Sequence, residues 1–383
     1  MYLMRSLFRQ AWLLILPVRA HSAVATSTNN QYETWADQAL VELQTFYNSS
    51  TGLWHSFPPS WWQSANALTT LADMVALNGT NAVKVANVVI PNTFRQAAAF
   101  NEAHNHHTKR GSSSSTTTAC INGFYDDEGW WAMAWIRAFD VTAREEYLSA
   151  AEGLFADMVT GWGTNCSSEG MWWDKAHTEI NPIANVLFLE VAAYLAKRVP
   201  AQQQTYVNWA LRGWNWLQQS GMWEASSHIL SGAIDVESCQ LHPGTHGWTY
   251  AQGTLIQALT ELSDVTGNST LLDQAVLVAD AVIALDTGDG ILVEPGIAGN
   301  PPTTDQSAEQ FKGVFMRGLA RLQRSRPDSK YQAFAEKNAQ SVWSNRKGAA
   351  LGFDWQDSFV GPADASMQSS AMDCLVAAWS MTS

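Results

Sequence analysis

The chain of 383 residues is long enough for one large domain or two ordinary domains with a substantial core. Apolar residues make up 46% of it and charged residues 15%, a composition that excludes an intrinsically disordered protein. The net charge of −13 argues against a nucleic-acid partner and suits an uncharged ligand. The 19 Trp residues point to clefts lined with rings, although rings also fill cores.

Residues 1–25 are predicted to be a secretory signal peptide. Arg5 and Arg9 precede an apolar run at 11–16, and the small residues at 23–25 offer a cleavage site. The apolar run is too short to span a membrane.

Four Asn-x-Ser/Thr sequences also favour secretion, since each is an acceptor for N-glycosylation. They begin at Asn48, Asn78, Asn165 and Asn268. We therefore expect a secreted, N-glycosylated protein with a single domain over residues 26–383.

The four Cys residues can pair in three ways. Cys374 lies inside an apolar helical pattern, which is typical of a buried free thiol. Cys166 and Cys239 fall in predicted loops and are the pair that we expect to form a disulfide, which leaves Cys120 over.

Apolar residues recur with the period of a helix in twelve segments, and the alternation typical of strands is almost absent. The segments are 32–47, 61–75, 81–100, 131–141, 147–158, 183–196, 206–217, 248–262, 271–285, 307–322, 331–343 and 367–379. Between the third and the fourth, residues 104–118 are rich in His, Ser and Thr. A metal site is one interpretation of this stretch, but His side chains in such a run are usually solvated, so we expect no metal and no cofactor.

The twelve helices form six pairs that repeat along the chain. The second helix of each pair begins near residues 62, 125, 184, 250, 310 and 368, which gives a loose period of about 60 residues. Six helical hairpins in a long repeat favour a closed ring, and the second helices carry the small residues expected of an inner ring. The predicted fold is all-α, an (α/α)6 barrel of six helical hairpins.

Residues 122–131 place three consecutive acids, Asp126, Asp127 and Glu128, between aromatic residues at the start of a helix. A functional interpretation is a carboxylate pair that acts on a sugar. The alternative is an ordinary helix N-terminus, where acids interact favourably with the helix dipole and the unpaired N–H groups. Buried charges cost several kcal/mol to desolvate, so acids among large rings call for a reason.

Aromatic residues recur in the loops that precede the predicted inner helices. In a closed ring these loops meet at one rim, together with Asp126 and Asp127. An acid in a later loop, Asp235, is a further candidate for binding a hydroxyl group, and a solvated loop acid is the alternative. The candidate sugar-binding residues are Trp61, Trp62, Asn66, Trp130, Trp173, Asp235, Trp248, Tyr250, Gln252, Lys312 and Trp355.

The sequence resembles glycoside hydrolase family 76, the endo-α-1,6-mannanases of fungi and bacteria. The segment Tyr-Asp-Asp-Glu-Gly-Trp-Trp at 125–131 resembles the catalytic motif of that family. Supporting similarities are Trp-Thr-Tyr-Ala-Gln-Gly at 248–253, Gln-Phe-Lys-Gly at 310–313 and Phe-Met-Arg at 315–317. The resemblance extends from about residue 31 to residue 379. Ala251 stands where the family often has Asn, and the His-rich stretch resembles an insertion, which affects substrate preference more than the chemistry.

The resemblance implies a retaining α-mannanase in which Asp126 is the nucleophile and Asp127 the general acid/base. Retaining hydrolysis needs two carboxyls about 5–5.5 Å apart, one ionised and one protonated. Because close like charges push pKa values apart, we expect Asp126 to have the lower pKa of the pair, stabilised by donors, and Asp127 the raised one. Glu128 is expected to have a structural role.

Two other functions remain open at this point. A cell-wall transglycosylase of the same family would use the same intermediate, with an acceptor sugar in place of water. A non-catalytic glycan-binding barrel is less favoured, because binding alone does not call for a carboxylate pair. The apolar residues near the C-terminus belong to the twelfth helix, so we expect no glycolipid anchor signal. We further expect that the protein is a monomer and that it binds mannan.

Overall fold

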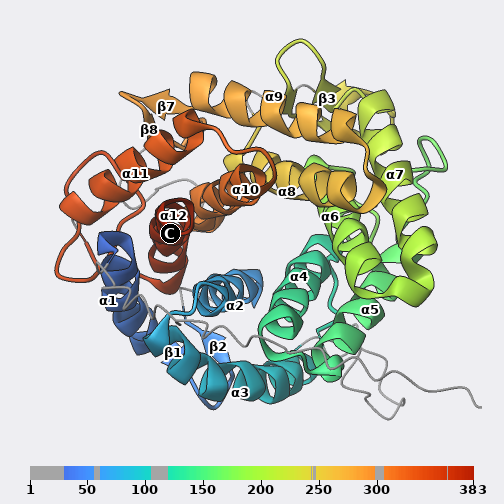
Figure 1. The fold of residues 1–383 in the computed structure, drawn as a ribbon. Helices are drawn as coiled ribbons and strands as arrows, with labels where there is room; N and C mark the ends of the chain where they lie inside the picture. The colour runs from blue at the N-terminus through green and yellow to red at the C-terminus, as the bar shows by residue number, and fades with distance from the viewer. Residues whose placement is uncertain are drawn as a thin grey trace, which may run out of the picture.

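The computed structural model describes residues 30–55, 61–104, 120–242, 244, 247–297, 306–359 and 361–383. Within them, twelve α-helices form an outer and an inner ring (Figure 1). The predicted signal peptide lies outside the described residues, as does most of the His-rich stretch, so both interpretations stay predictions. The proposed division of the chain at residue 25 is likewise untested.

The six outer and six inner helices alternate along the chain, which confirms the prediction of a barrel of helical hairpins (Figure 1). The outer helices are α1 (Gln31–Thr45), α3 (Thr80–His104), α5 (Glu145–Thr160), α7 (Gln203–Gln219), α9 (Ser269–Leu285) and α11 (Ser329–Ser344). The inner helices are α2 (Trp61–Ala76), α4 (Tyr125–Thr142), α6 (Pro182–Arg198), α8 (Thr249–Thr266), α10 (Phe311–Ser325) and α12 (Ala365–Thr382). Each inner helix begins close to its predicted start, and the last differs most, predicted near residue 368 and observed from Ala365.

Each inner helix contacts the next, and α12 contacts α2, so the ring is closed. Outer helix α1 packs against α12, and the Nδ2 of Asn30 donates to the Oγ1 of Thr382 at 2.8 Å. The inner helices are buried on almost every face because they pack on both the ring interior and the outer helices. This explains why the sequences of α6 and α12 lack a clear polar side.

Glycines allow the closest approach between inner helices. A Cβ atom at Gly253 of α8 would lie 2.5 Å from the Cα of Phe315 and from the carbonyl oxygen of Val314 in α10. From the other side, a Cβ at Gly318 would lie 2.4 Å from the carbonyl oxygen of Gly253. Helices α8 and α10 therefore touch backbone to backbone, a packing that only glycine permits there.

Ion pairs join all six inner helices, through the middle of α10 and α12 and through the C-terminal halves of the others. Arg137 of α4 donates through Nε to Asp73 of α2 at 2.9 Å, and Arg198 of α6 lies 3.0 Å from Glu261 of α8. The other pairs are Arg137–Asp140 (2.8 Å), Arg198–Asp140 (2.7 Å), Arg321–Glu261 (2.7 Å), Arg317–Asp373 (2.7 Å) and Arg317–Asp73 (4.0 Å). We call these residues the ion-pair circuit.

Over the described ranges, four short antiparallel hairpins interrupt the helical pattern. They are β1 (Tyr47–Asn48) with β2 (Leu53–Trp54), β3 (Trp223–Glu224) with β4 (Ile229–Leu230), β5 (Ala233–Ile234) with β6 (Leu241–His242), and β7 (Thr287–Gly288) with β8 (Ile291–Leu292). In β5–β6, Ala233 pairs with His242 and Ile234 with Leu241. Among the helices of the described part of the chain, none is long and apolar enough to cross a membrane.

The close packing of α8 on α10 predicts the effect of adding one methyl group. Gly253→Ala should lower the free energy of unfolding by about 1–3 kcal/mol, because the new Cβ meets rigid backbone. Gly213→Ala in α7 is the matched control, since its Cβ would lie 3.5 Å from the Cβ of Leu189, an ordinary contact, and it should be neutral or stabilising by up to ~1 kcal/mol. Urea unfolding monitored by circular dichroism measures both, and equal effects would contradict the proposed packing.

Candidate active site

A cleft of about 640 Å³ opens where the inner helices begin. Its walls come from the first turns of α2, α4, α6, α8 and α10, from the segment before α6, and from the loops around β4 to β6. The residues that line it are Trp62, Phe124, Asp126, Asp127, Trp130, Trp173, Glu179, Asn181, Pro182, Ile183, Leu230, Ser231, Gly232, Ala233, His242, Gly244, Gly247, Trp248, Tyr250, Ala251, Ser307 and Phe311. It thus lies at the end of the barrel opposite the ion-pair circuit.

Asp126 and Asp127 lie in the first turn of α4, whose N-cap, Phe124, provides no side-chain hydrogen bond. Asp126 is held by two donors: the backbone N–H of Asp127 to Oδ1 at 3.0 Å and the Nε1–H of Trp173 to Oδ2 at 2.9 Å. The Nδ2 of Asn122 donates to the Oδ2 of Asp127 at 2.6 Å. Each carboxyl is therefore fixed by a different neighbour, and both face the cleft.

The environment gives the two acids different affinities for a proton. Burial raises the pKa of Asp126 to about 6, although the hydrogen bonds from Trp173 and from backbone N–H groups oppose the rise. Burial, and then the charge of Asp126, raise the pKa of Asp127 well above its ordinary value, against the donor from Asn122. Asp126 has the lower pKa of the pair, which is the predicted order. Its pKa nevertheless lies above the ordinary Asp value, because burial outweighs the effect of the hydrogen-bond donors. Between the two pKa values, Asp126 is ionised and Asp127 is protonated.

The third acid of the motif points away from the cleft. The Glu128 side chain is fully buried, and its Oε1 lies 2.8 Å from the Nζ of Lys175, which also lies 2.6 Å from Asp157. Through Lys175, Glu128 connects α4 to α5 and to the loop that follows α5, which agrees with the structural role expected for Glu128.

Stacked rings form one wall of the cleft. Trp62 lies over Trp130 with ring centroids 5.7 Å apart, Trp130 over Tyr250 at 6.1 Å, and Tyr250 over Phe311 at 3.8 Å. Near the two acids, Trp173 packs on Phe124 at 4.9 Å. The predicted convergence of Trp62, Trp130, Trp173, Trp248 and Tyr250 with Asp126 and Asp127 is therefore observed.

Three predicted binding residues lie under the cleft wall rather than in it. The side chain of Trp61 packs on Trp131, with centroids 4.8 Å apart. Asn66, one turn further along α2, accepts hydrogen bonds from Arg317 at 3.1 Å inside the ring. Trp355 is 2% exposed and lies in the core. Neighbouring positions at the start of an inner helix point to different sides of it, so only one of two adjacent Trp residues reaches the cleft.

The remaining three are also outside the cleft. Gln252 is buried and holds Leu230, with its Nε2 donating to the Leu230 carbonyl at 2.8 Å and its Oε1 accepting from the Leu230 N–H at 3.0 Å. Lys312 is buried and donates to the carbonyl of Phe353 at 2.6 Å. Asp235 accepts from the N–H of Ser238 at 2.7 Å, within its own turn. These side chains make hydrogen bonds to backbone groups of the loops. Gln252 thereby positions Leu230, which lines the cleft, without lining the cleft itself.

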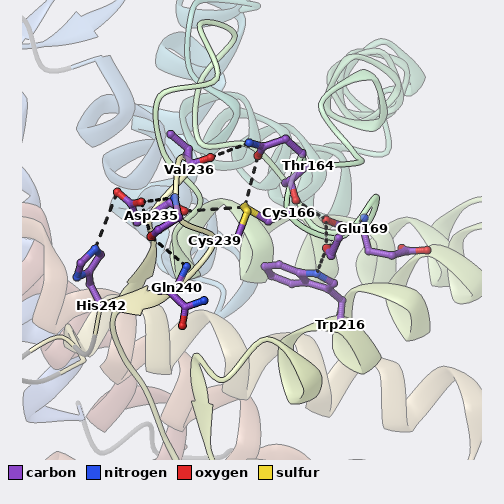
Figure 2. Close-up of a disulfide and its surroundings, with 12 residues drawn as sticks. Thr164, Cys166, Glu169, Trp216, Asp235, Val236, Cys239, Gln240 and His242 are labelled. Atoms are coloured by element: carbon purple, nitrogen blue, oxygen red, sulfur yellow. Dashed lines mark hydrogen bonds and ion pairs between the residues drawn. A yellow bond between two sulfur atoms is a disulfide. The ribbon is translucent and has the colours of Figure 1, made fainter.

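The disulfide between Cys166 and Cys239 is formed, as expected, and holds the wall built from β5 and β6 (Figure 2). Beside it, the Nδ2 of Asn165 donates to the carbonyl of Val236 at 2.7 Å. The other two cysteines, Cys120 and Cys374, are buried free thiols. The loop after α5 and the β5–β6 hairpin are thus fastened to each other.

Several residues that line the cleft are not predicted by the sequence analysis. Glu179, Asn181 and His242 line the cleft but lie in loops whose place in the ring the helical pattern does not give. Asn122 can be identified from the sequence as the first residue of the acidic segment, but its hydrogen bond to Asp127 cannot be predicted from it. Among the described residues, no group of three or more His, Cys, Asp and Glu side chains is arranged to hold a metal ion.

Comparison with known proteins gives the same fold and names a family. A Schizosaccharomyces pombe protein, provisionally named mannan endo-1,6-α-mannosidase, is 22% identical over 349 residues, which cover 86% of this chain and 73% of that protein. The α-1,6-mannanase structure from Salegentibacter superposes with a TM-score of 0.75 at 22% identity, covering 91% of this chain and 99% of that one. An inactive variant of that enzyme, with two consecutive aspartates replaced by alanine, is known in complex with an α-1,6-linked mannotetraose.

A second structure, Dfg5 from Chaetomium thermophilum in complex with glucosamine, superposes with a TM-score of 0.75 at 18% identity and covers 93% of this chain and 91% of that one. The sequence itself matches Glycosyl hydrolase family 76 over residues 31–382. That match spans every helix of both rings and the two acids in the cleft, and so this chain belongs to glycosyl hydrolase family 76.

Proposed function

We propose that the protein is an endo-acting, retaining hydrolase of the α-1,6-mannosidic linkages of mannan. The observation that carries the proposal is the pair Asp126 and Asp127, two neighbouring, half-buried carboxyls in one cleft with different pKa values. The name of the Schizosaccharomyces pombe relative and the loss of activity in the Salegentibacter variant support it. Family membership supports the class of reaction.

In this proposal, ionised Asp126 attacks the anomeric carbon while Asp127 gives its proton to the departing glycosidic oxygen. The product is a glycosyl ester on Asp126, and Asp127 is left ionised. Asp127 then takes a proton from a water molecule, whose oxygen attacks the same carbon and releases Asp126. Two displacements at one carbon restore the α configuration.

The residues around the acids suit these roles. Two donors hold the Asp126 carboxylate in one orientation, which keeps an oxygen aimed for attack. The ring wall of Trp62, Trp130 and Tyr250 offers apolar surface to the C–H faces of sugars along the cleft. Burial of Asp127 keeps its proton available at neutral pH.

We also propose that the protein is secreted and N-glycosylated, works as a monomer on mannan, and has no nucleic-acid partner. Exposed side chains at Asn78, Asn165 and Asn268 support glycosylation, and Asn48 is half-buried. The Cys166–Cys239 disulfide supports an oxidising compartment. The net charge of −13 supports the absence of a nucleic-acid partner.

Replacement of either acid tests the site. Asp126→Asn and Asp127→Asn should each abolish turnover of linear α-1,6-mannan while the unfolding midpoint stays close to that of the wild type. An aryl mannoside whose leaving group needs no proton should partly restore turnover to Asp127→Ala but not to Asp126→Ala. The reverse pattern would exchange the two roles, and wild-type rates in both variants would refute the site.

The stereochemistry and size of the products test the reaction. Proton NMR during early turnover should show the α anomer first, because the reaction proceeds through a covalent intermediate. Mass profiles should show shorter oligosaccharides. A β anomer appearing first would exclude the mechanism, and longer products would show the transglycosylase alternative instead.

The pH dependence tests the two pKa values. Because Asp126 must be ionised, kcat/KM should fall as the pH drops through about 6, and because Asp127 must be protonated, it should fall again above the raised pKa of Asp127. Asn122→Ala removes a donor that favours the ionised form of Asp127, so the basic limb should move to higher pH. The acidic limb of the same variant is the internal control and should stay near 6. A basic limb that stays in place would contradict the role of Asn122.

A further inference from the structure

A third carboxylate lines the cleft beside the two acids of the motif. Glu179 belongs to an extended segment before α6, where its carbonyl accepts from the N–H of Trp173 at 2.9 Å. The next residue, Ile180, accepts from the N–H of Ile234 in β5 at 2.9 Å. The backbone of Glu179 is therefore held on one side by the residue that binds Asp126 and on the other by the β5–β6 hairpin.

The side chain is held as well. The Nδ2 of Asn181 donates to the Oε1 of Glu179 at 3.1 Å. Asn181 is itself fixed, since it caps α6 by accepting from the N–H of Ala184 at 3.3 Å. A carboxylate that is oriented by a fixed amide and faces a cleft is preorganised to accept a hydrogen bond from a ligand.

In the part of the chain that the structure describes, no cation neutralises the charge of Glu179. Within the described residues, no ion pair includes Glu179, and the lining of the cleft contains no Lys or Arg. Its negative charge also contributes, after burial, to the raised pKa of Asp126. Lys175, which precedes Glu179 by four positions in the sequence, is already paired with Glu128 and Asp157. The cleft therefore presents three carboxyls to its ligand, and an anionic group would meet repulsion there.

We propose that Glu179 determines substrate specificity in the mannanase proposed above: its carboxylate binds a hydroxyl group of the sugar beside Trp173, and its charge excludes phosphate-bearing sugars from that position. The proposal rests on the proposed function, and it adds a preference for neutral over phosphorylated mannan. The hydroxyl groups of mannose can donate hydrogen bonds, and hydrogen bonds to a charged carboxylate are stronger than those to a neutral acceptor.

The test compares Glu179→Gln with Glu237→Gln, which makes the same change at an exposed position outside the cleft. Calorimetry in an Asp127→Asn background gives dissociation constants without turnover. Glu179→Gln should weaken the binding of α-1,6-mannotetraose and of mannose by about tenfold, because a hydrogen bond to a charged acceptor becomes one to a neutral acceptor. It should tighten the binding of mannose 6-phosphate, because the repulsion is removed. Glu237→Gln should change neither.

Opposite changes for a neutral and an anionic sugar separate this role from a purely structural one, which would weaken both. In the otherwise wild-type enzyme, Glu179→Gln should also move the acidic limb of the pH profile below that of the wild type, since one of the charges beside Asp126 is lost. The other titratable side chains lining the cleft, Asp127, His242 and Tyr250, are unchanged in this variant.

The outcomes distinguish the two proposals. If the wild type hydrolyses mannotetraose but Glu179→Gln binds both sugars as Glu237→Gln does, the role of Glu179 is refuted and the proposed function stands. If the wild type neither hydrolyses nor binds mannotetraose, both are refuted. A parallel loss of affinity for mannose and mannose 6-phosphate would assign Glu179 to holding Asn181 and α6 instead.

Discussion

The closed ring depends on the ion-pair circuit, because every inner helix contributes at least one residue to it. Arg317 closes it, 2.7 Å from Asp373 and 4.0 Å from Asp73. Removing one partner of a buried ion pair leaves an uncompensated charge and costs about 3–5 kcal/mol. Any rearrangement that separated two inner helices would break such a pair, so we infer that the circuit selects this order of helices over other packings of the same apolar faces.

Burial has opposite net outcomes for the pKa of Glu261 in the circuit and for the pKa values of the two acids in the cleft. At the circuit, burial raises the pKa of Glu261, but Arg198 and Arg321 more than compensate and hold it below the ordinary value. In the cleft, no guanidinium faces Asp126 or Asp127 among the described residues, and burial keeps both pKa values high. Stability and chemistry are thus built from the same residue types at separate ends of the barrel, with Asp126 and Asp127 kept away from the guanidinium groups of the circuit.

Much of the fold and part of the candidate site could be predicted from the sequence. Helical periodicity gave the two rings, and partners in the circuit are separated by 64, 58, 63, 60 and 56 residues, close to the repeat of about 60. The sequence could not tell Trp62 from Trp61 or Trp355, because whether a ring faces a cleft or the core depends on the direction of its helix. Nor could it bring Glu179 close to Asp126, since the link runs through Trp173, whose backbone N–H donates to Glu179 and whose indole N–H donates to Asp126.

Ring closure also sets a limit on how the chain folds. The contacts that join its ends are Asn30 with Thr382, Gln368 with Ala39, and Thr70 with Asp373, which lie 352, 329 and 303 residues apart in the sequence. During synthesis, the first hairpin therefore waits with one flank uncovered until the last has left the ribosome. Contacts of such long range form slowly, and partly assembled rings expose apolar surface. We infer that yield in a heterologous host depends on the lifetime of the open ring, a kinetic property that the stability of the finished barrel does not report.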